Sequence, residues 1–178
     1  MLALTSGLRY EELVGLTPDD FNFTSNTIHV NKTWGYNNRM PKGFGPTKND
    51  QSNRMIDMDE ITMTEFKKLF STLKPNKENL VFYSPTSKYK VLSNTLSNKL
   101  LKKMLLSLNI NPITVHGLRH THASILLSHG ISIYYVSKRL GHSDVETTHK
   151  YYTHLTEELY ERDSKNTVSI FNNMKKNK

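Results

Sequence analysis

The chain has 178 residues, 36% of them hydrophobic, so a single domain with a sizeable core is expected. It contains no cysteine, which excludes disulfides, thiolate nucleophiles and zinc sites that need sulfur. No apolar run approaches the roughly 18 residues of a membrane span, and the N-terminus lacks the layout of a signal peptide. These features predict a cytoplasmic protein with no membrane partner.

The net charge of +8 is unevenly distributed along the chain. Residues 1–60 have a balance of −2, residues 61–120 of +8, and residues 121–178 of +2. A localised basic region is typical of a protein that binds a polyanion, because Lys and Arg displace counterions from phosphates. A solvated lysine-rich surface has the same composition, so charge alone leaves both interpretations open.

The first half of the chain combines helical patterns with a short β region. Apolar spacing predicts a helix over Leu8–Leu16, and Pro18 suits the first position of the next helical turn. The capping box Thr62-x-x-Glu65 predicts a helix that runs to about Leu73. Alternating residues and turn signals predict three short strands, the first two joined by a long Gly- and Pro-containing hairpin loop: Thr27–Lys32, Arg54–Met58 and Val81–Tyr83.

The second half of the chain is predicted to be helical throughout. Apolar stripes and boundary residues indicate helices at Ser93–Leu108, Thr114–His129 and Ser132–Leu140. A fourth helix is expected to begin at the capping box Ser143-Asp144-Val145-Glu146, and a fifth to cover about Thr156–Phe171. His122 and His129 fall on the apolar stripe of their helix and are interpreted as structural. The fold class that these patterns favour is mainly α with a small β region.

Several polar residues could act on a phosphate. His116 and Arg119 are three apart on one helix, where an imidazole and a guanidinium can face the same ligand. Arg9 and Glu12 have the same spacing, and His142 lies in a tight Gly141-His142-Ser143 turn. Taken singly, each pattern is more common as a surface pair or a packing feature than as an active site.

Two other function classes fit parts of the same sequence. A DNA-binding module without catalysis could use a cluster of lysines in the middle of the chain: Lys67, Lys68, Lys88, Lys90, Lys99, Lys102 and Lys103. A metal-dependent hydrolase could use His116, His120 and His122, the first two spaced as metal ligands often are. Gly117, however, stands where an H-E-x-x-H motif has its Glu, and no nearby carboxylate supplies a third ligand.

The ordered set of motifs is far more specific than any one of them. SGLRYEEL, a lysine in a hairpin, HGLRHTHAS, LGHSD and TTHKYYTH follow one another from residue 1 to about residue 160. This order resembles the catalytic domain of the tyrosine recombinases, closest in look to integrases of phages and mobile elements of Gram-positive bacteria. The resemblance implies a mainly helical α+β domain with a small antiparallel sheet. It further implies a site-specific recombinase or integrase that cleaves and rejoins DNA through a 3′-phosphotyrosine, with no metal, ATP or other cofactor.

The resemblance also implies domain limits and partners. Such enzymes have an N-terminal DNA-clamping domain that these residues lack, so we expect an N-terminally truncated catalytic domain over residues 1–172 and a basic tail over residues 173–178. The implied partner is double-stranded DNA at attachment sites, bound by a tetramer of the full-length protein, with possible DNA-bending or directionality proteins. A type IB topoisomerase, which relaxes supercoils without joining two sites, is the alternative within the same chemistry.

Carried over residue by residue, the resemblance implies a set of site residues. The catalytic set is Arg9, Lys48, His116, Arg119, His142 and Tyr152, with Glu12 in a supporting role and Lys88, Lys90 and Lys99 binding DNA. The arginines and His142 would stabilise charge on the phosphate, His116 would be the base, and Lys48 the general acid. Lys42 remains the alternative to Lys48, because the length of the hairpin loop does not fix the register.

The nucleophile is one of two adjacent tyrosines. Tyr151 follows His142 by nine residues and Tyr152 by ten, and both spacings occur among the tyrosine recombinases. The local pattern Thr147-Thr148-x-x-x-Tyr152, followed by Thr153-His154, resembles the surroundings of the nucleophile in integrases. We therefore expect Tyr152 to attack and Tyr151 to be a neighbour, a choice that substitution of each must test.

Overall fold

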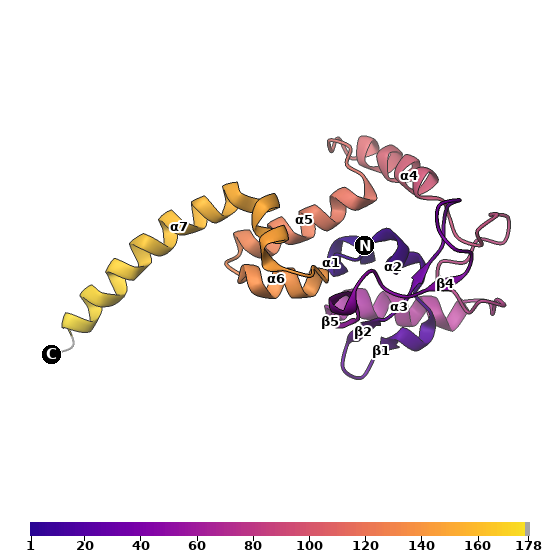
Figure 1. Cartoon of the computed structure of the whole chain (residues 1–178), viewed down its shortest axis with the longest axis horizontal. Helices are drawn as coiled ribbons and strands as arrows, with labels where there is room; N and C mark the ends of the chain where they lie inside the picture. Colours follow the sequence, from indigo (N-terminus) through magenta and orange to yellow (C-terminus); the bar gives the residue numbers. More distant parts are fainter. Residues whose placement is uncertain (177–178) are drawn as a thin grey trace.

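The computed structural model describes the backbone of residues 1–176 and the side chains of residues 1–153, 160 and 162–174. Within these residues the chain forms helices and short strands in an order that Figure 1 shows. The α-helices are α1 (Leu2–Ser6), α2 (Tyr10–Val14), α3 (Glu60–Thr72), α4 (Asn94–Ser107), α5 (Val115–Ser128), α6 (Ile133–Leu140) and α7 (Val145–Lys176). The strands are β1 (Phe21–Asn22), β2 (Thr27–Val30), β3 (Thr33–Trp34), β4 (Phe44–Gly45) and β5 (Arg54–Asp57), with 3₁₀ turns η1 (Pro18–Asp20) and η2 (Asp50–Ser52).

The strands form two small antiparallel sheets, so the predicted α+β architecture is confirmed. One sheet has the order β1-β2-β5, and β2 pairs with β5 so that Ile28 lies opposite Ile56. The other joins β3 to β4. Because side chains alternate across a strand, Ile28 and Val30 point to one face, and both are buried. The predicted strands Thr27–Lys32 and Arg54–Met58 are therefore correct in place and slightly too long.

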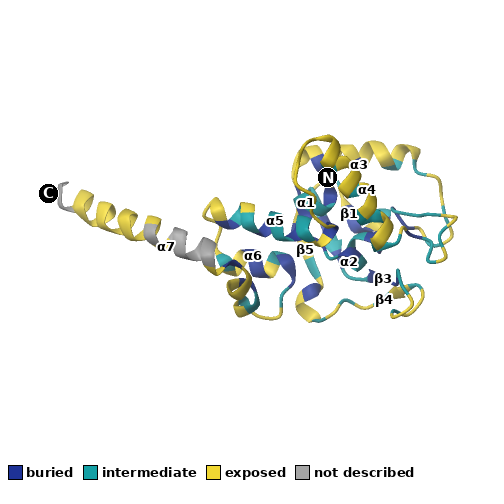
Figure 2. Ribbon diagram, turned by 90° about the horizontal axis from the view of Figure 1, so that it is seen from above, coloured by how far each residue is buried: buried dark blue, intermediate teal, exposed yellow. Residues whose placement is uncertain are grey.

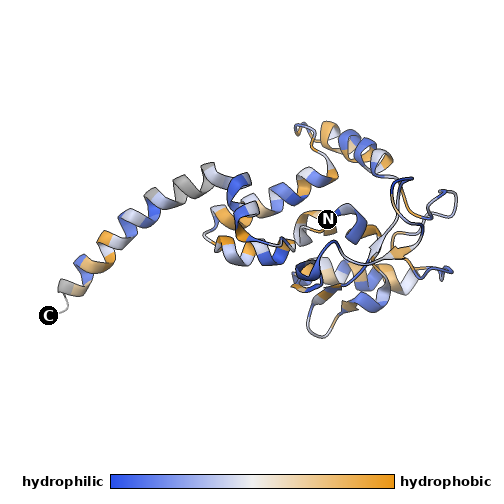
Figure 3. Cartoon of the chain, viewed as in Figure 1, coloured by the Kyte–Doolittle hydropathy of each residue, from blue (hydrophilic) through white to orange (hydrophobic). Residues whose placement is uncertain are grey.

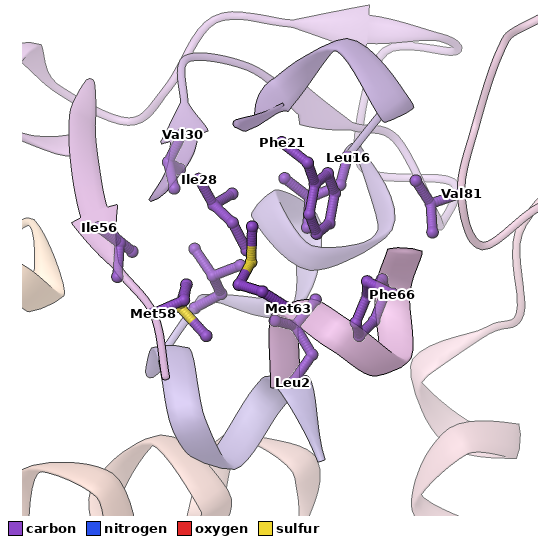
Figure 4. Close-up of a cluster of buried hydrophobic side chains, with 11 residues drawn as sticks. Leu2, Leu16, Phe21, Ile28, Val30, Ile56, Met58, Met63, Phe66 and Val81 are labelled. Atoms are coloured by element: carbon purple, nitrogen blue, oxygen red, sulfur yellow. The ribbon is translucent and has the colours of Figure 1, made fainter. Parts of the chain in front are cut away.

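Three groups of buried apolar side chains hold these elements together. Figure 2 marks the buried residues of the chain in dark blue. The largest packs α1 and α3 against the three-stranded sheet, and Figure 4 shows Phe21, Met63 and Phe66 gathered within it. A second surrounds Trp34. The third joins α5, α6 and the start of α7 through Leu127, Val136 and Tyr152, so the residue proposed as nucleophile is part of the core.

The first residues of α2 and α3 differ from the predicted ones, because capping side chains fix where each helix begins. The expected helix over Leu8–Leu16 is limited to Tyr10–Val14, because Arg9 is extended (φ −67°, ψ 155°) and its backbone N–H donates to the Glu12 carboxylate at 2.9 Å. The α3 helix begins earlier than predicted. Asp59 is its N-cap and accepts from the backbone N–H of Thr62 at 2.8 Å, so Thr62 is a buried first-turn residue rather than a cap.

The third predicted strand is wrong. Val81–Tyr83 forms a single bridge from Tyr83 to Val91, and the Val81 N–H donates instead to the Leu16 carbonyl at 2.9 Å. A β-branched and aromatic run thus packs as a loop on the core, because its backbone finds a partner outside a sheet.

The last helix is divided as predicted, a few residues earlier than expected. The α7 helix spans Val145–Lys176, and non-helical dihedral angles at Tyr152 (φ −124°, ψ 23°) bend it, whereas the sequence placed the division just before Thr156. Its first turn is capped by Asp144, not by Ser143, since the Asp144 carboxylate accepts from the Thr147 N–H at 2.7 Å. Residues 173–176 of the predicted basic tail continue α7, and residues 177–178 lie outside the described part. Figure 1 shows α7 extending away from the rest of the chain.

The α4 helix lies where the sequence predicts it, with Ser93 as N-cap, but its apolar stripe is not buried. Leu96, Leu100, Met104 and Leu108 are 41–61% exposed, and orange and blue alternate along α4 in Figure 3.

His122 is buried as expected. His129 is exposed, because it lies at the C-cap of α5, where its Nδ1–H donates to the Ile125 carbonyl at 2.8 Å. Among the helices that the structure describes, none is both long and apolar enough to cross a membrane.

Candidate active site

A polar cavity of about 210 Å³ lies where the start of α2, the loop before η2, α5, the end of α6 and α7 meet. Its lining includes all six residues predicted to be catalytic: Arg9, Lys48, His116, Arg119, His142 and Tyr152. The lining also includes His120 and Tyr151. Lys42 instead lines a different cavity, together with Lys88 and Lys90. The structure thus brings Lys48, and not its alternative, to the site.

Arg9 is fixed at the start of α2 by contacts on both sides of its guanidinium. Its Nη1 donates to Oε1 of Glu12 at 2.9 Å, and its Nη2 donates to the Gly141 carbonyl at 2.9 Å. Glu12 is fully buried. Burial alone would raise the pKa of the Glu12 carboxyl, but the positive charges of Arg54 and Arg9 outweigh it, so the pKa is lowered and Glu12 stays ionised.

Arg54 is a site residue that the sequence patterns did not identify. Its Nη2 and Nη1 donate to the two carboxylate oxygens of Glu12 at 3.1 and 3.2 Å, and its Nε donates to the Arg139 carbonyl at 2.6 Å. Arg54 and Ile56 are two apart on β5 and therefore point to the same, buried face. An arginine on the buried face of a predicted strand is a signal that could have found it, because a buried guanidinium needs an ionic partner.

Arg119 is buried on α5 and held by two backbone carbonyls. Its Nη1 donates to the Gly7 carbonyl at 2.7 Å and its Nη2 to the Leu140 carbonyl at 2.8 Å. Burial and the neighbouring charge of Arg9 lower the pKa of Arg119 to about 9, so the guanidinium remains charged at neutral pH. Leu140 and Gly141 end α6, where unpaired carbonyls favour cations. The C-terminus of α6 therefore holds both arginines in place.

His142 follows directly, because Gly141 takes a left-handed conformation (φ +69°) that turns the chain out of α6. The Nδ1 of His142 lies 2.7 Å from Oγ1 of Thr148, which is fully buried. Burial and the charges of Arg119 and Arg9 lower the pKa of His142 to about 4, so the imidazole is neutral at pH 7. A threonine hydroxyl that donates to Nδ1 leaves the ring proton on Nε2, as a donor suited to an anionic oxygen.

The two tyrosines differ sharply in exposure. Tyr152 is 4% exposed, whereas Tyr151 is 61% exposed. Tyr152 has non-helical dihedral angles (φ −124°, ψ 23°) that bend α7, and its hydroxyl lies 2.9 Å from Nδ1 of His120. Burial raises the pKa of the Tyr152 hydroxyl, and the charge of Arg119 opposes that rise. The hydroxyl is therefore protonated at neutral pH.

The two histidines of α5 that line the cavity are neighbours. The rings of His116 and His120 meet edge to face, with centroids 4.8 Å apart. Burial lowers the pKa of both, with a further contribution from Arg119, so both imidazoles are largely neutral at pH 7. Within the part of the chain that the structure describes, His120 contacts the Tyr152 hydroxyl and His116 has no hydrogen bond to it.

Lys48 is exposed on the loop that leads to η2. That loop is tied to the rest of the site through buried Ser52, whose Oγ accepts from Nη1 of Arg9 at 3.2 Å and lies 3.2 Å from the Gly141 carbonyl. The Asn49 side chain accepts from the Ser52 N–H at 2.9 Å. The backbone beside Lys48 is thus anchored, while its exposed side chain lines the cavity.

The comparisons with known proteins agree on one family. Residues 1–158 match the model of the phage integrase family. The chain belongs to that family. It is 35% identical over 167 residues to the integrase of Staphylococcus phage L54a, covering 88% of this chain and 47% of the relative. It is 34% identical over 161 residues to the tyrosine recombinase XerD of Rickettsia prowazekii, covering 86% of this chain and 49% of the relative. The chain therefore spans about half the length of the curated relatives it matches.

Solved structures of tyrosine recombinases share the fold of this phage integrase family member. The Tn1549 transposon integrase in complex with circular intermediate DNA superposes with a TM-score of 0.72 at 22% identity, covering 90% of this chain and 57% of that one. The XerA recombinase gives a TM-score of 0.66 at 21% identity, covering 91% and 53%. The chain has the fold of a tyrosine recombinase catalytic domain, as the motifs predicted.

The metal-site interpretation of the histidines finds no support in this family member. His122 uses both ring nitrogens, since its Nδ1–H donates to the Leu4 carbonyl at 2.8 Å and its Nε2 accepts from Nε of Arg139 at 3.0 Å. It therefore has no lone pair to offer a cation. Among the described side chains, no three of His, Asp or Glu gather in a way that could hold a metal ion.

Proposed function

We propose that this chain is the catalytic part of a site-specific DNA recombinase or integrase, with residues 1–172 as the catalytic domain and residues 173–178 as a basic tail. The observation that supports it best is the meeting of six residues, from five separate segments, around one cavity. Two fixed guanidiniums, a neutral imidazole donor, an exposed lysine and a buried tyrosine match the needs of phosphodiester cleavage by a tyrosine. Membership of the phage integrase family supports the same reaction.

In this proposal the scissile phosphate binds between the two arginines. Arg9 and Arg119 donate to its non-bridging oxygens, and Nε2 of His142 donates to the same group. Because these donors are already fixed by Glu12 and by the end of α6, little reorganisation is needed as negative charge grows on the phosphorane. Glu12 acts only through Arg9.

The chemical step exchanges one phosphoester for another. Oη of Tyr152 loses its proton to a neutral imidazole of α5 and bonds to phosphorus, and the bond from phosphorus to the 5′-oxygen breaks. Lys48 donates a proton to that leaving oxygen. The products are a 3′-phosphotyrosine and a 5′-hydroxyl, and reversal rejoins the strand. Because the bond energy is stored in the phosphotyrosine, neither ATP nor a metal enters the step.

We propose double-stranded DNA at attachment sites as the substrate. Lys88 and Lys99 are exposed, and Lys88 and Lys90 line a second cavity where they can contact the DNA backbone. The Tn1549 integrase structure is a complex with DNA. Joining two duplexes requires cleavage of four strands, so we propose that the whole protein assembles as a tetramer on DNA, with DNA-bending or directionality proteins as accessory partners.

A suicide substrate tests the proposal, because a nick beside the cleavage site lets the 5′ fragment diffuse away and traps the phosphotyrosine. We expect the 178-residue chain to form a covalent adduct that mass spectrometry locates on Tyr152. Tyr152→Phe removes only the attacking oxygen and should abolish the adduct, while Tyr151→Phe should still form it. Loss of the adduct only in Tyr151→Phe would reassign the nucleophile. Adduct from both variants and from the double variant would overturn the proposed reaction.

A further inference from the structure

The hydroxyl of Tyr152 is hydrogen-bonded to a histidine that the family motif does not place in the reaction. His120 lies one helical turn after His116 on α5, so both rings are on the same side of that helix. The distance of 2.9 Å between Tyr152 Oη and His120 Nδ1 is that of a direct hydrogen bond. His116 contacts the His120 ring instead.

A proton acceptor is required at this point of the site. An unperturbed tyrosine has a pKa of about 10, and burial raises the pKa of Tyr152, so the free phenolate is scarce at neutral pH. The acceptor must lie within hydrogen-bonding reach of Oη at the moment of attack. Among the described side chains, His120 is the titratable group that forms such a bond.

We propose that His120 is the catalytic base that takes the proton of Tyr152, and that His116 positions the His120 ring through their edge-to-face contact. This inference rests on the proposed function. As Oη bonds to phosphorus, its O–H bond breaks and the proton passes to Nδ1 of His120, which becomes an imidazolium. When the strand is rejoined, Nδ1 returns the proton to Oη and the phosphotyrosine bond breaks.

The charges around His120 fit this cycle. Burial and Arg119 lower the pKa of His120, which keeps it neutral and able to accept before substrate binds. The other charged or titratable side chains lining the same cavity are Arg9, Lys48, His116, His142, Tyr151 and Tyr152. A bound phosphate anion offsets the two arginines, so the proton affinity of His120 should rise once the scissile group is in place.

The proposal requires that Nδ1 of His120 has no proton in the resting protein. Nitrogen-15 NMR of the free chain reports this directly, because protonated and unprotonated ring nitrogens have distinct chemical shifts. We expect His120 to carry its proton on Nε2 at pH 7.5, with Oη of Tyr152 as the donor in the shared hydrogen bond. A proton on Nδ1 would mean that His120 only donates to the tyrosine, and would overturn the proposal without affecting the proposed function.

Single-turnover adduct formation on the suicide substrate separates a base from a merely structural partner. In the wild-type chain the rate should rise with pH as His120 loses its proton, and then level off. His120→Asn can keep a hydrogen bond to Oη but cannot take a proton, so we expect a rate lower by about 10²- to 10⁴-fold. That rate should also increase about tenfold per pH unit, because the tyrosine must then ionise alone.

His116→Asn is the matched control, one turn away on the same helix face. The rate of adduct formation by this variant should still rise with pH and reach a plateau, even if the plateau is lower than in the wild type. The proposal would be overturned if His120→Asn formed the adduct at the wild-type rate with the wild-type pH dependence. It would also be overturned if His116→Asn alone lost the plateau of the rate at high pH. Thermal unfolding of each variant shows whether a slow rate reflects a failure to fold.

A substrate with sulfur in place of the bridging 5′-oxygen separates the base from the acid. Its thiolate leaving group departs without protonation. On this substrate Lys48→Ala should therefore form the adduct at close to the wild-type rate, while His120→Asn should still form it slowly. Recovery of both variants would overturn the assignment of His120 as base. A wild-type chain that forms no adduct on either substrate would instead overturn the proposed function itself.

Discussion

The two sides of the cavity are held in contrasting ways. On one side, the arginine cluster of Arg9, Arg54 and Arg119 makes hydrogen bonds to Glu12 and to the carbonyls that end α6. On the other side, the Tyr152 hydroxyl has the single hydrogen bond to His120 that the structure shows, at a bend in α7. The side proposed to bind the phosphate is thus fixed by many polar contacts, whereas Tyr152 is held by one hydrogen bond of its hydroxyl and by the packing of its ring in the core.

The largest effect should come from removing the phosphate-facing charge of the arginine cluster. Arg119→Ala and Arg9→Ala should each slow adduct formation by at least 10²-fold, about 3 kcal/mol, because each deletes a charged donor aimed at the phosphorane. Lysine should restore little activity, since it lacks the planar fork. Near wild-type rates of adduct formation in either alanine variant would show that the arginines serve the fold and not the reaction.

Arg54 should matter first for stability. Arg54→Met leaves the buried Glu12 carboxylate with Arg9 as its remaining ionic partner, so we expect a loss of about 3 kcal/mol in the free energy of unfolding. Urea denaturation measures it, with Arg39→Met as the control on an exposed arginine. Adding Glu12→Gln to Arg54→Met should recover part of the loss, because no unpaired charge is then buried. Equal stabilities of Arg54→Met and Arg39→Met would contradict the role given to Arg54.

Thr148 should affect rate more than stability. Thr148→Val removes the hydroxyl that contacts Nδ1 of His142 but keeps the side-chain shape, so His142 can place its proton on either nitrogen. We expect adduct formation to slow about fivefold, which corresponds to the loss of one hydrogen bond of about 1 kcal/mol, and Thr148→Ser to behave as wild type. The same slowing in Thr148→Ser would point to packing rather than to the hydroxyl.

A pH dependence of stability should follow from two histidines with lowered pKa values. The pKa values of His122 and His142 are lowered to about 4 in the folded chain, whereas they are about 6.5 when unfolded. Between these values the unfolded state binds more protons, so stability should fall as the pH decreases from about 6.5 towards 4, by at most about 3 kcal/mol for each histidine. Thermal unfolding at several pH values should show a shallower slope in His122→Gln. If stability depended on pH equally in His122→Gln and in the wild type, groups other than His122 would be responsible for the pH dependence.

The sequence predicted the members of the site better than their contacts. Arg9, His116, Arg119 and His142 lie in short ordered motifs, and the helices carrying them begin at residues with clear capping chemistry, such as Thr114 and Ser132. Arg54 and Glu12 are 42 residues apart, and Arg9 and Gly141 are 132 apart. No local pattern specifies such pairs, because they depend on how β5 and α6 pack.

The errors at helix ends have a local physical cause. The prediction began a helix at Leu8, yet the Glu12 carboxylate accepts the Arg9 N–H and makes Arg9 the last extended residue before α2. The contact of Tyr152 with His120 was missed for a related reason, since it depends on the position of the bend in α7, which regular helical spacing does not predict.

The bend at Tyr152 makes α7 a lever with unequal arms. Residues 145–151 form the short arm beside α6, and residues 153–176 form the long arm that leaves the body of the molecule (Figure 1). Because the bend lies at Tyr152 itself, a change in the angle between the two arms would move the Tyr152 hydroxyl relative to Arg9 and Arg119.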